Sequence, residues 1–360
     1  MKSWLLLSIS IIVSQICSAY SNSFSIINVI DTSKNEYLYK QFTKLNSYLN
    51  WYLYIKSQGG FPAIPNISHE LKLYDSSRNV ALIKKYFIIS KDAVQNDTSI
   101  YFNNSFREAI LNYQKRMGLR ITGIVDQSLI NDLNTNIDRR ITSIQSSLKR
   151  FNDLQSVSNA NVILINIPDF NLYVIENGQY LFSMKVIVGK TTNKTSIFYK
   201  PLSNIVLCPY WNVPKNILEK EILPMLKYNR NFLSANNMEW YKNGIRQKPG
   251  RNNALGLIKF LFPNSFNIYM HDTPLKYLFK EDTRAFSHGC IRIEDAKKLA
   301  NYLLKKDTSW NSEKIDLFLS KNKETNISLK ENTMVIIDYF TTWVDELGKI
   351  NFRKDIYQLN

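Results

Sequence analysis

The 360-residue chain has few of the residues that mark special sequence classes: 11 glycines, 10 prolines, three cysteines and three histidines. So little glycine and proline excludes a collagen-like or linker-like polymer. Three cysteines exclude a disulfide-built scaffold and a pair of CxxC zinc clamps. With 44% hydrophobic and 21% charged residues, the composition is that of a folded protein. The length predicts two or three modules, because single hydrophobic cores rarely exceed about 300 residues.

Long hydrophobic runs are also missing, except near the N-terminus. Lys2 precedes the apolar stretch 4–13, and Cys17-Ser18-Ala19 supplies the small residues that a signal peptidase reads. The stretch is about half as long as the ~20 residues that a membrane-spanning helix needs. We therefore expect residues 1–19 to be a signal peptide of an exported protein with no membrane span in its mature chain. An uncleaved N-terminal membrane anchor is the alternative.

Acidic residues are too few to balance the basic ones: 46 Lys and Arg face 30 Asp and Glu, a formal charge of +16. In a cytosolic protein this excess would indicate nucleic acid. In an exported protein it favours contact with an anionic envelope polymer, or reflects composition alone. We therefore expect no nucleic-acid partner.

The first half of the chain has helical patterns. Residues 20–98 predict a helical scaffold and residues 99–137 a small helical module. Within that module, Ser105 to Glu108 has the pattern of a capping box with Ser105 as the N-cap, and Gly118 ends the helix. A Thr122-Gly123 turn then leads to a second, short helix. Residues 138–160 predict an amphipathic connecting helix.

From residue 162 the hydrophobic period changes to two. Alternating segments at 162–167, 172–175 and 182–190 predict strands, and Asn177-Gly178 predicts a hairpin turn between two of them. Because strands and helices do not alternate, we predict an α+β protein whose mainly antiparallel, sandwich-like or barrel-like β domain covers 161–306. Residues 211–248 are too long for a hairpin loop and predict a lid. Residues 307–360 should pack on the β domain or the scaffold.

The chemistry-bearing residues gather between 271 and 292. His271 should end a strand that places Tyr269 and His271 on one face, and a neighbouring strand should begin near Cys290. A thiol becomes a useful nucleophile when an imidazole can take its proton. Gly289 permits a left-handed backbone before the thiol, so that adjacent N–H groups can point at an oxyanion.

Several other interpretations of these residues stay open. Cys290 could instead join Cys208 in a disulfide, although Cys208 lies in an apolar run typical of a core. His271, His288 and Cys290 could bind zinc. Arg292 could bind a substrate carboxylate or pair with Asp295. The remaining choices concern shape: His288 and Ser287 could act in the site or only hold the turn, and Trp211 could line a groove or belong to the core.

The run from Ser287 to Arg292, preceded by His271-Asp272-Thr273-Pro274, resembles the catalytic motif of L,D-transpeptidases of the YkuD type. The segments 209–214 and 247–250 are similar to the large murein L,D-transpeptidases of Gram-negative bacteria. Residues 113–134 resemble the small peptidoglycan-binding module of cell-wall enzymes.

The resemblance implies a cofactor-free and metal-free acyltransferase of the periplasm or cell envelope, with an inner-membrane anchor as the alternative location. Its Cys290 would attack a peptidoglycan tetrapeptide stem at meso-diaminopimelate, release D-alanine and pass the acyl group to the diaminopimelate amine of a neighbouring stem. The same site could serve an L,D-carboxypeptidase or murein hydrolase, and a wall-binding module without activity is a non-enzymatic alternative. The resemblance also implies covalent labelling of Cys290 by carbapenems.

The resemblance further assigns roles to the surrounding residues. His271 would be the base, oriented by the Asp272 carbonyl. The oxyanion and the shape of the site would depend on Ser287, His288 and Gly289. The predicted substrate-binding residues are Arg292, Trp211 and Tyr269.

Overall fold

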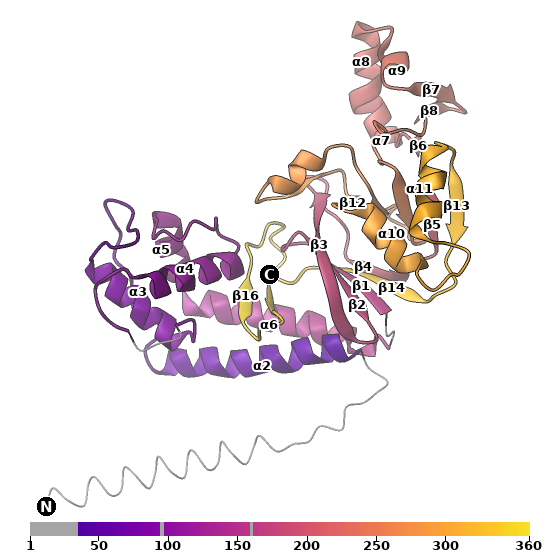
Figure 1. The fold of residues 1–360 in the computed structure, drawn as a ribbon. Coiled ribbons are helices and arrows are strands. Elements are labelled where there is room, and N and C mark those ends of the chain that lie inside the picture. The colour runs from indigo at the N-terminus through magenta and orange to yellow at the C-terminus, as the bar shows by residue number, and fades with distance from the viewer. Residues whose placement is uncertain (1–34, 94–96, 159–160) are drawn as a thin grey trace, which may run out of the picture.

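The computed structural model describes residues 35–93, 97–158 and 161–360. The predicted signal peptide lies outside these residues. A helical region and a β region lie side by side, and a slender insertion projects from the β region (Figure 1). None of the helices in the described ranges is both long and apolar enough to cross a membrane.

The helical region is built by the first part of the chain. Its two longest helices, α2 (Glu36–Ser57) and α6 (Ile137–Asp153), pack against each other. The other elements are α3 (Arg78–Ile89), α4 (Asn104–Met117), α5 (Gln127–Leu133) and the short 3-10 helix η1 (Leu154–Ser156). The predicted second helix of the small module and the connecting helix are therefore present, as α5 and α6.

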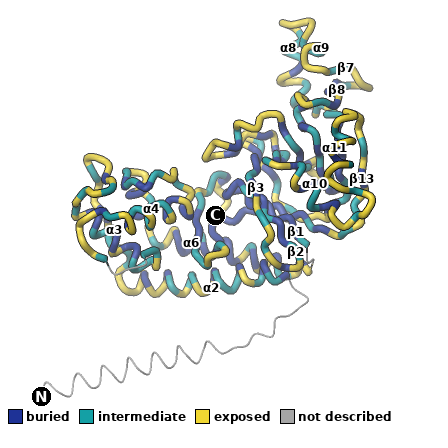
Figure 2. Tube along the Cα trace, viewed as in Figure 1, coloured by how far each residue is buried: buried dark blue, intermediate teal, exposed yellow. Residues whose placement is uncertain are grey.

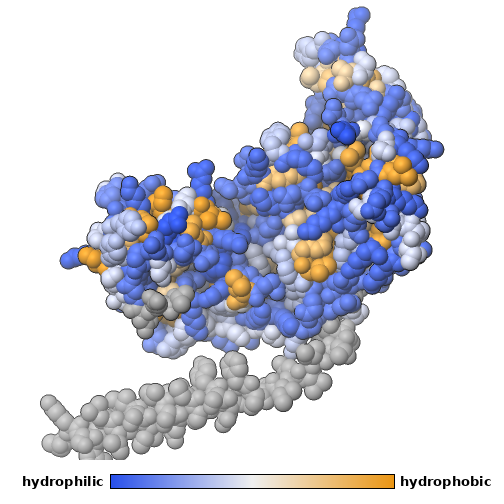
Figure 3. Space-filling model, in the orientation of Figure 1, coloured by the Kyte–Doolittle hydropathy of each residue, from blue (hydrophilic) through white to orange (hydrophobic). Residues whose placement is uncertain are grey.

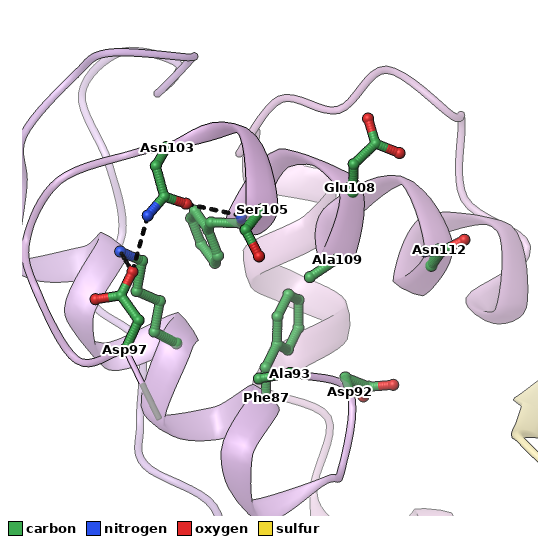
Figure 4. A pocket seen from close by; sticks show the side chains of 11 residues that line it. Phe87, Asp92, Ala93, Asp97, Asn103, Ser105, Glu108, Ala109 and Asn112 are labelled. Carbon is green, nitrogen blue, oxygen red and sulfur yellow. Dashed lines mark hydrogen bonds and ion pairs between the residues drawn. The ribbon is translucent and has the colours of Figure 1, made fainter. Parts of the chain in front are cut away.

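Helix α4 begins two residues earlier than its sequence pattern suggests. Asn103, and not Ser105, is the N-cap, because its side-chain oxygen accepts the Phe106 N–H at 2.9 Å (Figure 4). Asn103 also donates to Asp97, which is paired with the buried Lys84. The side-chain oxygen of an asparagine can cap a helix as well as a serine hydroxyl can. The Ser-x-x-Glu pattern alone therefore placed the N-cap at the wrong residue. The predicted stop at Gly118 is confirmed, with φ at 65°.

The C-terminal hairpin belongs to the helical region. Strands β15 (Thr342–Val344) and β16 (Ile350–Phe352) pair antiparallel and contact α2, α4 and α6. The buried Gln41 of α2 binds both backbone groups of Val344, at 2.7 and 2.9 Å. The hairpin thus packs on the scaffold, whereas Tyr339 and Tyr357 belong to the core inside the β region. These are the two positions predicted for residues 307–360.

The β region is a curled sheet of eleven strands. Their order is β13-β5-β9-β10-β12-β3-β2-β1-β14-β4, with β11 paired to β3. The bounds are β1 Asn161–Asn166, β2 Asn171–Glu176, β3 Gln179–Gly189, β4 Phe198–Pro201, β5 Asn204–Leu207, β9 Ile258–Leu261, β10 Met270–His271, β11 Ala285–Ser287, β12 Ile291–Ile293, β13 Thr325–Ser328 and β14 Thr333–Asp338. The predicted α+β class is confirmed. Most pairs are antiparallel, but β1 with β14, β10 with β12 and β11 with β3 run parallel.

The middle of the sheet separates two hydrophobic cores. Val162 and Leu164 of β1 face the core shared with the helical region, whereas Ile163 and Ile165 face the core inside the β region. Both faces of β1 are therefore buried, which explains why its sequence is continuously apolar. Figure 2 shows this buried middle between the two regions.

The sheet extends beyond the predicted end of the β domain at residue 306. Strand β14 pairs with β1 in the middle of the sheet, and β13 forms its outer edge beside β5. Helix α10 (Ala296–Leu304) lies before them and buries the predicted face that includes Leu299 and Leu303, and α11 (Ser312–Ser320) follows. The 3-10 helix η3 (Lys276–Lys280) lies between β10 and β11.

The insertion at 211–248 has a structure of its own. It contains β6 (Trp211–Asn212), α7 (Lys215–Ile217), the π-helix η2 (Leu218–Ile222), α8 (Leu223–Tyr228), α9 (Phe232–Ala235), β7 (Met238–Tyr241) and β8 (Gly244–Gln247). Helices α8 and α9 stand away from the body, and the insertion is largely exposed (Figures 1 and 2). Its surface carries pale orange apolar patches near that end (Figure 3).

Candidate active site

A pocket of about 700 Å³ lies where the insertion meets strands β9, β10 and β12. It contains most of the predicted site residues: Cys290, His271, Ser287, His288, Arg292, Trp211 and Tyr269. The insertion contributes one wall through residues 211–217 and Glu221. The pocket therefore unites segments separated by up to about eighty residues in the sequence.

Strand pairing fixes how the central side chains face one another. His271 pairs with Lys259 of β9 on one side and with Arg292 of β12 on the other. Directly paired residues of neighbouring strands show their side chains on the same face. Lys259, His271 and Arg292 thus form one row across three strands. The expected faces of β10 are confirmed, because Met270 is buried in the core while Tyr269 and His271 line the pocket.

The imidazole of His271 is held by its own backbone neighbourhood. Its Nδ1 donates to the Asp272 carbonyl oxygen at 2.5 Å, so the neutral ring has its free lone pair on Nε2. Burial, with the positive charges of Arg292 and Lys259, lowers the pKa of His271 to about 3. The ring is therefore neutral at pH 7 and has the tautomer that a base needs.

The side chain of Asp272 fixes the position of its own backbone carbonyl, which orients His271. Its Oδ2 accepts the Leu257 N–H at 2.9 Å, and its Oδ1 accepts from Lys276 at 2.6 Å. Gly256 makes the contact with Leu257 possible, because it has φ of 63° and a Cβ there would lie 2.4 Å from Asp272 Oδ2. A larger residue at 256 would displace the loop that orients His271.

Cys290 lies one residue before β12, at the floor of the pocket. Its Sγ is 3.8 Å from the Asn267 carbonyl oxygen, so in this conformation the thiol points to a carbonyl and not to the ring. Burial raises the pKa of the Cys290 thiol, although hydrogen bonding with Tyr269 and the charges of Lys259 and Arg292 oppose the rise. Burial therefore favours a neutral thiol beside a neutral imidazole in this conformation, and the transfer of the thiol proton to His271 stays a prediction.

Ser287 acts on the turn before the thiol. Its Oγ donates to the Cys290 carbonyl at 2.5 Å and accepts the Gly289 N–H at 3.0 Å. The turn-stabilising interpretation of Ser287 fits this geometry. Gly289 has φ of 116°, which a side chain would strain, but its N–H is already used by Ser287. The expectation that Gly289 donates to an oxyanion is therefore not met here, and the Cys290 N–H remains as the backbone candidate.

Further hydrogen bonds connect the same turn, through Thr195, to Tyr357 near the end of the chain. Thr195 donates from Oγ1 to the Gly289 carbonyl at 2.9 Å, and its N–H is bound by the Tyr357 hydroxyl at 3.2 Å. Tyr357 is buried, and its hydroxyl also donates to Gly189. Neither residue carried a sequence signal for the site, because their contacts span about 94 and 162 residues.

His288 points to the insertion. Its Nε2 lies 2.9 Å from Glu221 Oε1 of η2, and both side chains line the pocket. His288 thus links the turn that carries the thiol to the wall formed by the insertion. This contact supports a structural role for His288, and Glu221 is a site residue that sequence reasoning missed.

The predicted substrate-binding residues surround the thiol. Tyr269 packs its ring 5.7 Å from that of His271, and Trp211 lines the opposite wall. Arg292 has a buried Nε without a hydrogen-bond partner. Its alternative pairing with Asp295 is not seen among the described ion pairs, and Asp295 instead caps α10 by accepting the Lys298 N–H at 2.9 Å.

The other predicted roles of the cysteines can be checked directly. Cys208 and Cys290 are both free, so the disulfide alternative is wrong. Cys208 is completely buried, as expected for a core residue. Within the described ranges, His, Cys, Asp and Glu side chains form no group of three or more that could hold a metal ion.

Comparisons with known proteins point to one family of catalytic domains. Residues 160–336 match the YkuD family model, the L,D-transpeptidase catalytic domain. A curated Haemophilus influenzae protein named "Putative L,D-transpeptidase" is 32% identical over 218 residues, which are 55% of this chain and 44% of that protein. The chain thus spans less than half the length of this relative. Residues 160–336 are therefore similar to the L,D-transpeptidase catalytic domain of the YkuD type.

Solved L,D-transpeptidases are more distant. The enzyme from Stackebrandtia nassauensis is 13% identical, with a TM-score of 0.30 and coverage of 77% of this chain and 96% of that one. The one from Mycobacterium smegmatis is 12% identical, with a TM-score of 0.27 and coverage of 50% and 58%.

Proposed function

We propose that this protein is a peptidoglycan L,D-transpeptidase of the cell envelope, with Cys290 as nucleophile and His271 as base. The observation that carries the proposal is their shared pocket of about 700 Å³: His271 ends β10, and Cys290 directly precedes β12, the parallel neighbour of β10. The substrate would be a tetrapeptide stem with meso-diaminopimelate. The pocket is large enough for a peptide segment of this size.

In the first step, Cys290 forms a thioester. The Sγ–H proton passes to Nε2 of His271 while sulfur bonds to the carbonyl carbon at the L-centre of diaminopimelate. The C–N bond to D-alanine then breaks, and the imidazolium returns the proton to the leaving amine. For this step the thiol must turn away from the Asn267 carbonyl and toward the ring.

In the second step, the side-chain amine of a neighbouring stem attacks the thioester. His271 takes a proton from this amine, and the thiolate leaves and is reprotonated. The product is a link between two diaminopimelates, and neither a metal nor a cofactor takes part. We propose that the insertion at 211–248 shelters the thioester from water, since its base already forms one wall of the pocket.

Mass spectrometry of the purified protein tests the proposal. With a tetrapeptide donor alone, wild-type protein should gain the mass of the acyl group on Cys290 and release D-alanine. Addition of an acceptor stem should discharge the adduct into a cross-linked dimer. Cys290→Ala should do neither, whereas Cys208→Ala should behave as wild type. Tripeptides without dimers would instead indicate an L,D-carboxypeptidase, and no adduct at all a wall-binding module without activity.

Carbapenem labelling gives an independent measurement. Incubation with a carbapenem should add one drug mass to wild-type protein and none to Cys290→Ala. An unchanged intact mass of the wild type would count against a nucleophilic Cys290.

A further inference from the structure

The pocket holds two cations that form no ion pair in the described parts of the chain. The ammonium of Lys259 lies 3.9 Å from the centre of the Tyr269 ring, and the carboxylate of Glu324 acts on it only beyond ion-pair distance. Arg292 also lacks an acidic partner, and its Nε is buried without a hydrogen bond. Burial lowers the pKa of both groups, because desolvation disfavours their charged forms.

The other charged groups that face the pocket are already engaged. Among its lining residues, Glu221 is the acid, and it contacts His288 at 2.9 Å. Lys215 at the rim lies 3.8 Å from Glu219. Lys259 and Arg292 remain, directly paired with His271 on its two sides. Their charges have the sign that attracts an anion, and their pairing places one on each side of the imidazole.

We propose that Lys259 and Arg292 form a carboxylate-binding row on either side of His271, and that a bound peptide carboxylate activates His271 as a base. The inference rests on the proposed function and deepens it, because it defines the donor as a peptide with a free carboxylate next to the scissile bond. A free carboxyl-terminal D-alanine carries such a group. Arg292 can bind it through two parallel N–H groups, and Lys259 as a point charge.

The physical reason is the charge on the ring. Burial and the two flanking cations oppose protonation of His271, so in the empty pocket the ring is a poor acceptor for the thiol proton. A carboxylate between the cations cancels part of their field, and the imidazolium that forms when the thiol is deprotonated becomes less costly. Acylation would then begin only when the correct chain end is bound. The thiol would otherwise stay neutral and unreactive.

The experiment compares two donors and four proteins. The donors are the tetrapeptide with a free D-alanine carboxylate and the same peptide ending in D-alaninamide. The proteins are wild type, Lys259→Met, Lys259→Arg and, as matched control, Lys215→Met, which removes a lysine from the rim of the same pocket. The release of D-alanine or D-alaninamide gives kcat/KM, and melting curves confirm that each variant is folded.

The expected pattern is a loss that depends on the carboxylate. Wild type should prefer the acid donor by 30-fold or more. Lys259→Met should lose at least 10-fold with the acid but no more than 2-fold with the amide. Lys259→Arg should recover most of the loss, and Lys215→Met should stay within 2-fold of wild type with both donors.

NMR titration of His271 supplies a readout that a merely structural lysine would not change. In isotope-labelled protein, assigned with His271→Asn, saturating N-acetyl-D-alanine should raise the pKa of His271 by one pH unit or more. The same ligand should have no such effect in Lys259→Met, where the pKa of the free protein should already be higher.

Opposite results separate the two proposals. If wild type releases D-alanine but treats acid and amide donors equally, the carboxylate row is wrong and the transferase stands. The row is equally wrong if Lys259→Met loses the same factor with both donors, because Lys259 would then act on the thiolate. If wild type acts on neither donor, the proposed function itself fails.

Discussion

Buried cations are paired with carboxylates in the helical region but not in the active-site pocket. In the helical region each of three buried cations has a carboxylate partner, in the pairs Lys84–Asp97, Arg116–Asp92 and Arg140–Asp132. In the pocket, Lys259 and Arg292 have no such partner within the described residues. The same residue types therefore hold the scaffold together in one place and remain available for a ligand in the other.

The difference follows from what each region must do. An ion pair inside a packed interface fixes the geometry of its neighbours, and removing one member leaves an uncompensated charge. A cation without a partner lowers the stability of the empty protein, so it persists where a ligand supplies the missing charge. If this comparison is right, removing a buried cation will lower the free energy of unfolding in the helical region but not in the pocket.

Arg116→Met should have the largest effect. Arg116 and Asp92 are both more than nine-tenths buried as side chains, and Arg116 also donates to the Ile350 carbonyl of the C-terminal hairpin at 2.5 Å. Removing the guanidinium leaves Asp92 with an unpaired buried charge, which costs about 3–5 kcal/mol. Urea unfolding should show this loss, while any acyl transfer by the folded protein should be unchanged.

The double variant Arg116→Met with Asp92→Asn is the control. It removes the stranded charge and should recover part of the lost stability. If Arg116→Met alone cost less than about 1 kcal/mol, the pair would contribute no more than an exposed one, and the comparison would fail in the helical region.

Acid should weaken the folded state through His271. The pKa of His271 is about 3 in the folded protein against an ordinary value of 6.5. Between these values the unfolded chain binds a proton that the folded chain excludes, so stability falls as pH decreases from about 6.5. The slope from this group is at most about 1.4 kcal/mol per pH unit. His271→Gln should flatten the difference between pH 7 and pH 5, measured by urea unfolding; an unchanged slope would show that the ring titrates normally.

The local part of the site could be predicted from the sequence. The alternation of Ile268, Tyr269, Met270 and His271 already places two residues in the core and two on the pocket face, because successive side chains of a strand point to opposite faces. The thiol motif ending at Cys290 marks the second strand. Such short-range patterns depend only on neighbouring residues.

The partners that depend on long-range register could not be predicted. Lys259 reaches the site only because β9 pairs with β10 in one particular register, and a shift by one residue would turn its side chain into the core. Glu221 reaches His288 through the fold of the insertion, 67 residues along the chain. The lowered pKa of His271 likewise follows from its burial and from the charges of Arg292 and Lys259, all of which depend on the assembled pocket.

Two substitutions at the start of helix α4 test which residue is its N-cap. Asn103→Ala removes the side-chain acceptor for the Phe106 N–H and should cost about 1 kcal/mol of unfolding free energy. Ser105→Ala should cost less than about 0.5 kcal/mol, because Ser105 lies inside the helix and caps nothing. Thermal melts of the two variants decide the matter, and equal losses would restore the cap suggested by the sequence pattern.

The smallest expected effect is that of Lys259→Met on stability. The substitution keeps the length of the side chain and removes a cation that has no partner in the described structure, so the free energy of unfolding should stay unchanged or rise by up to about 1 kcal/mol. Lys84→Met removes a cation buried against Asp97 and should instead lower the free energy of unfolding by about 3–5 kcal/mol. Urea unfolding of the two variants side by side measures the contrast. A loss above about 2 kcal/mol for Lys259→Met would mean that the lysine holds the sheet together, and the distinction between paired scaffold charges and free pocket charges would no longer explain either region.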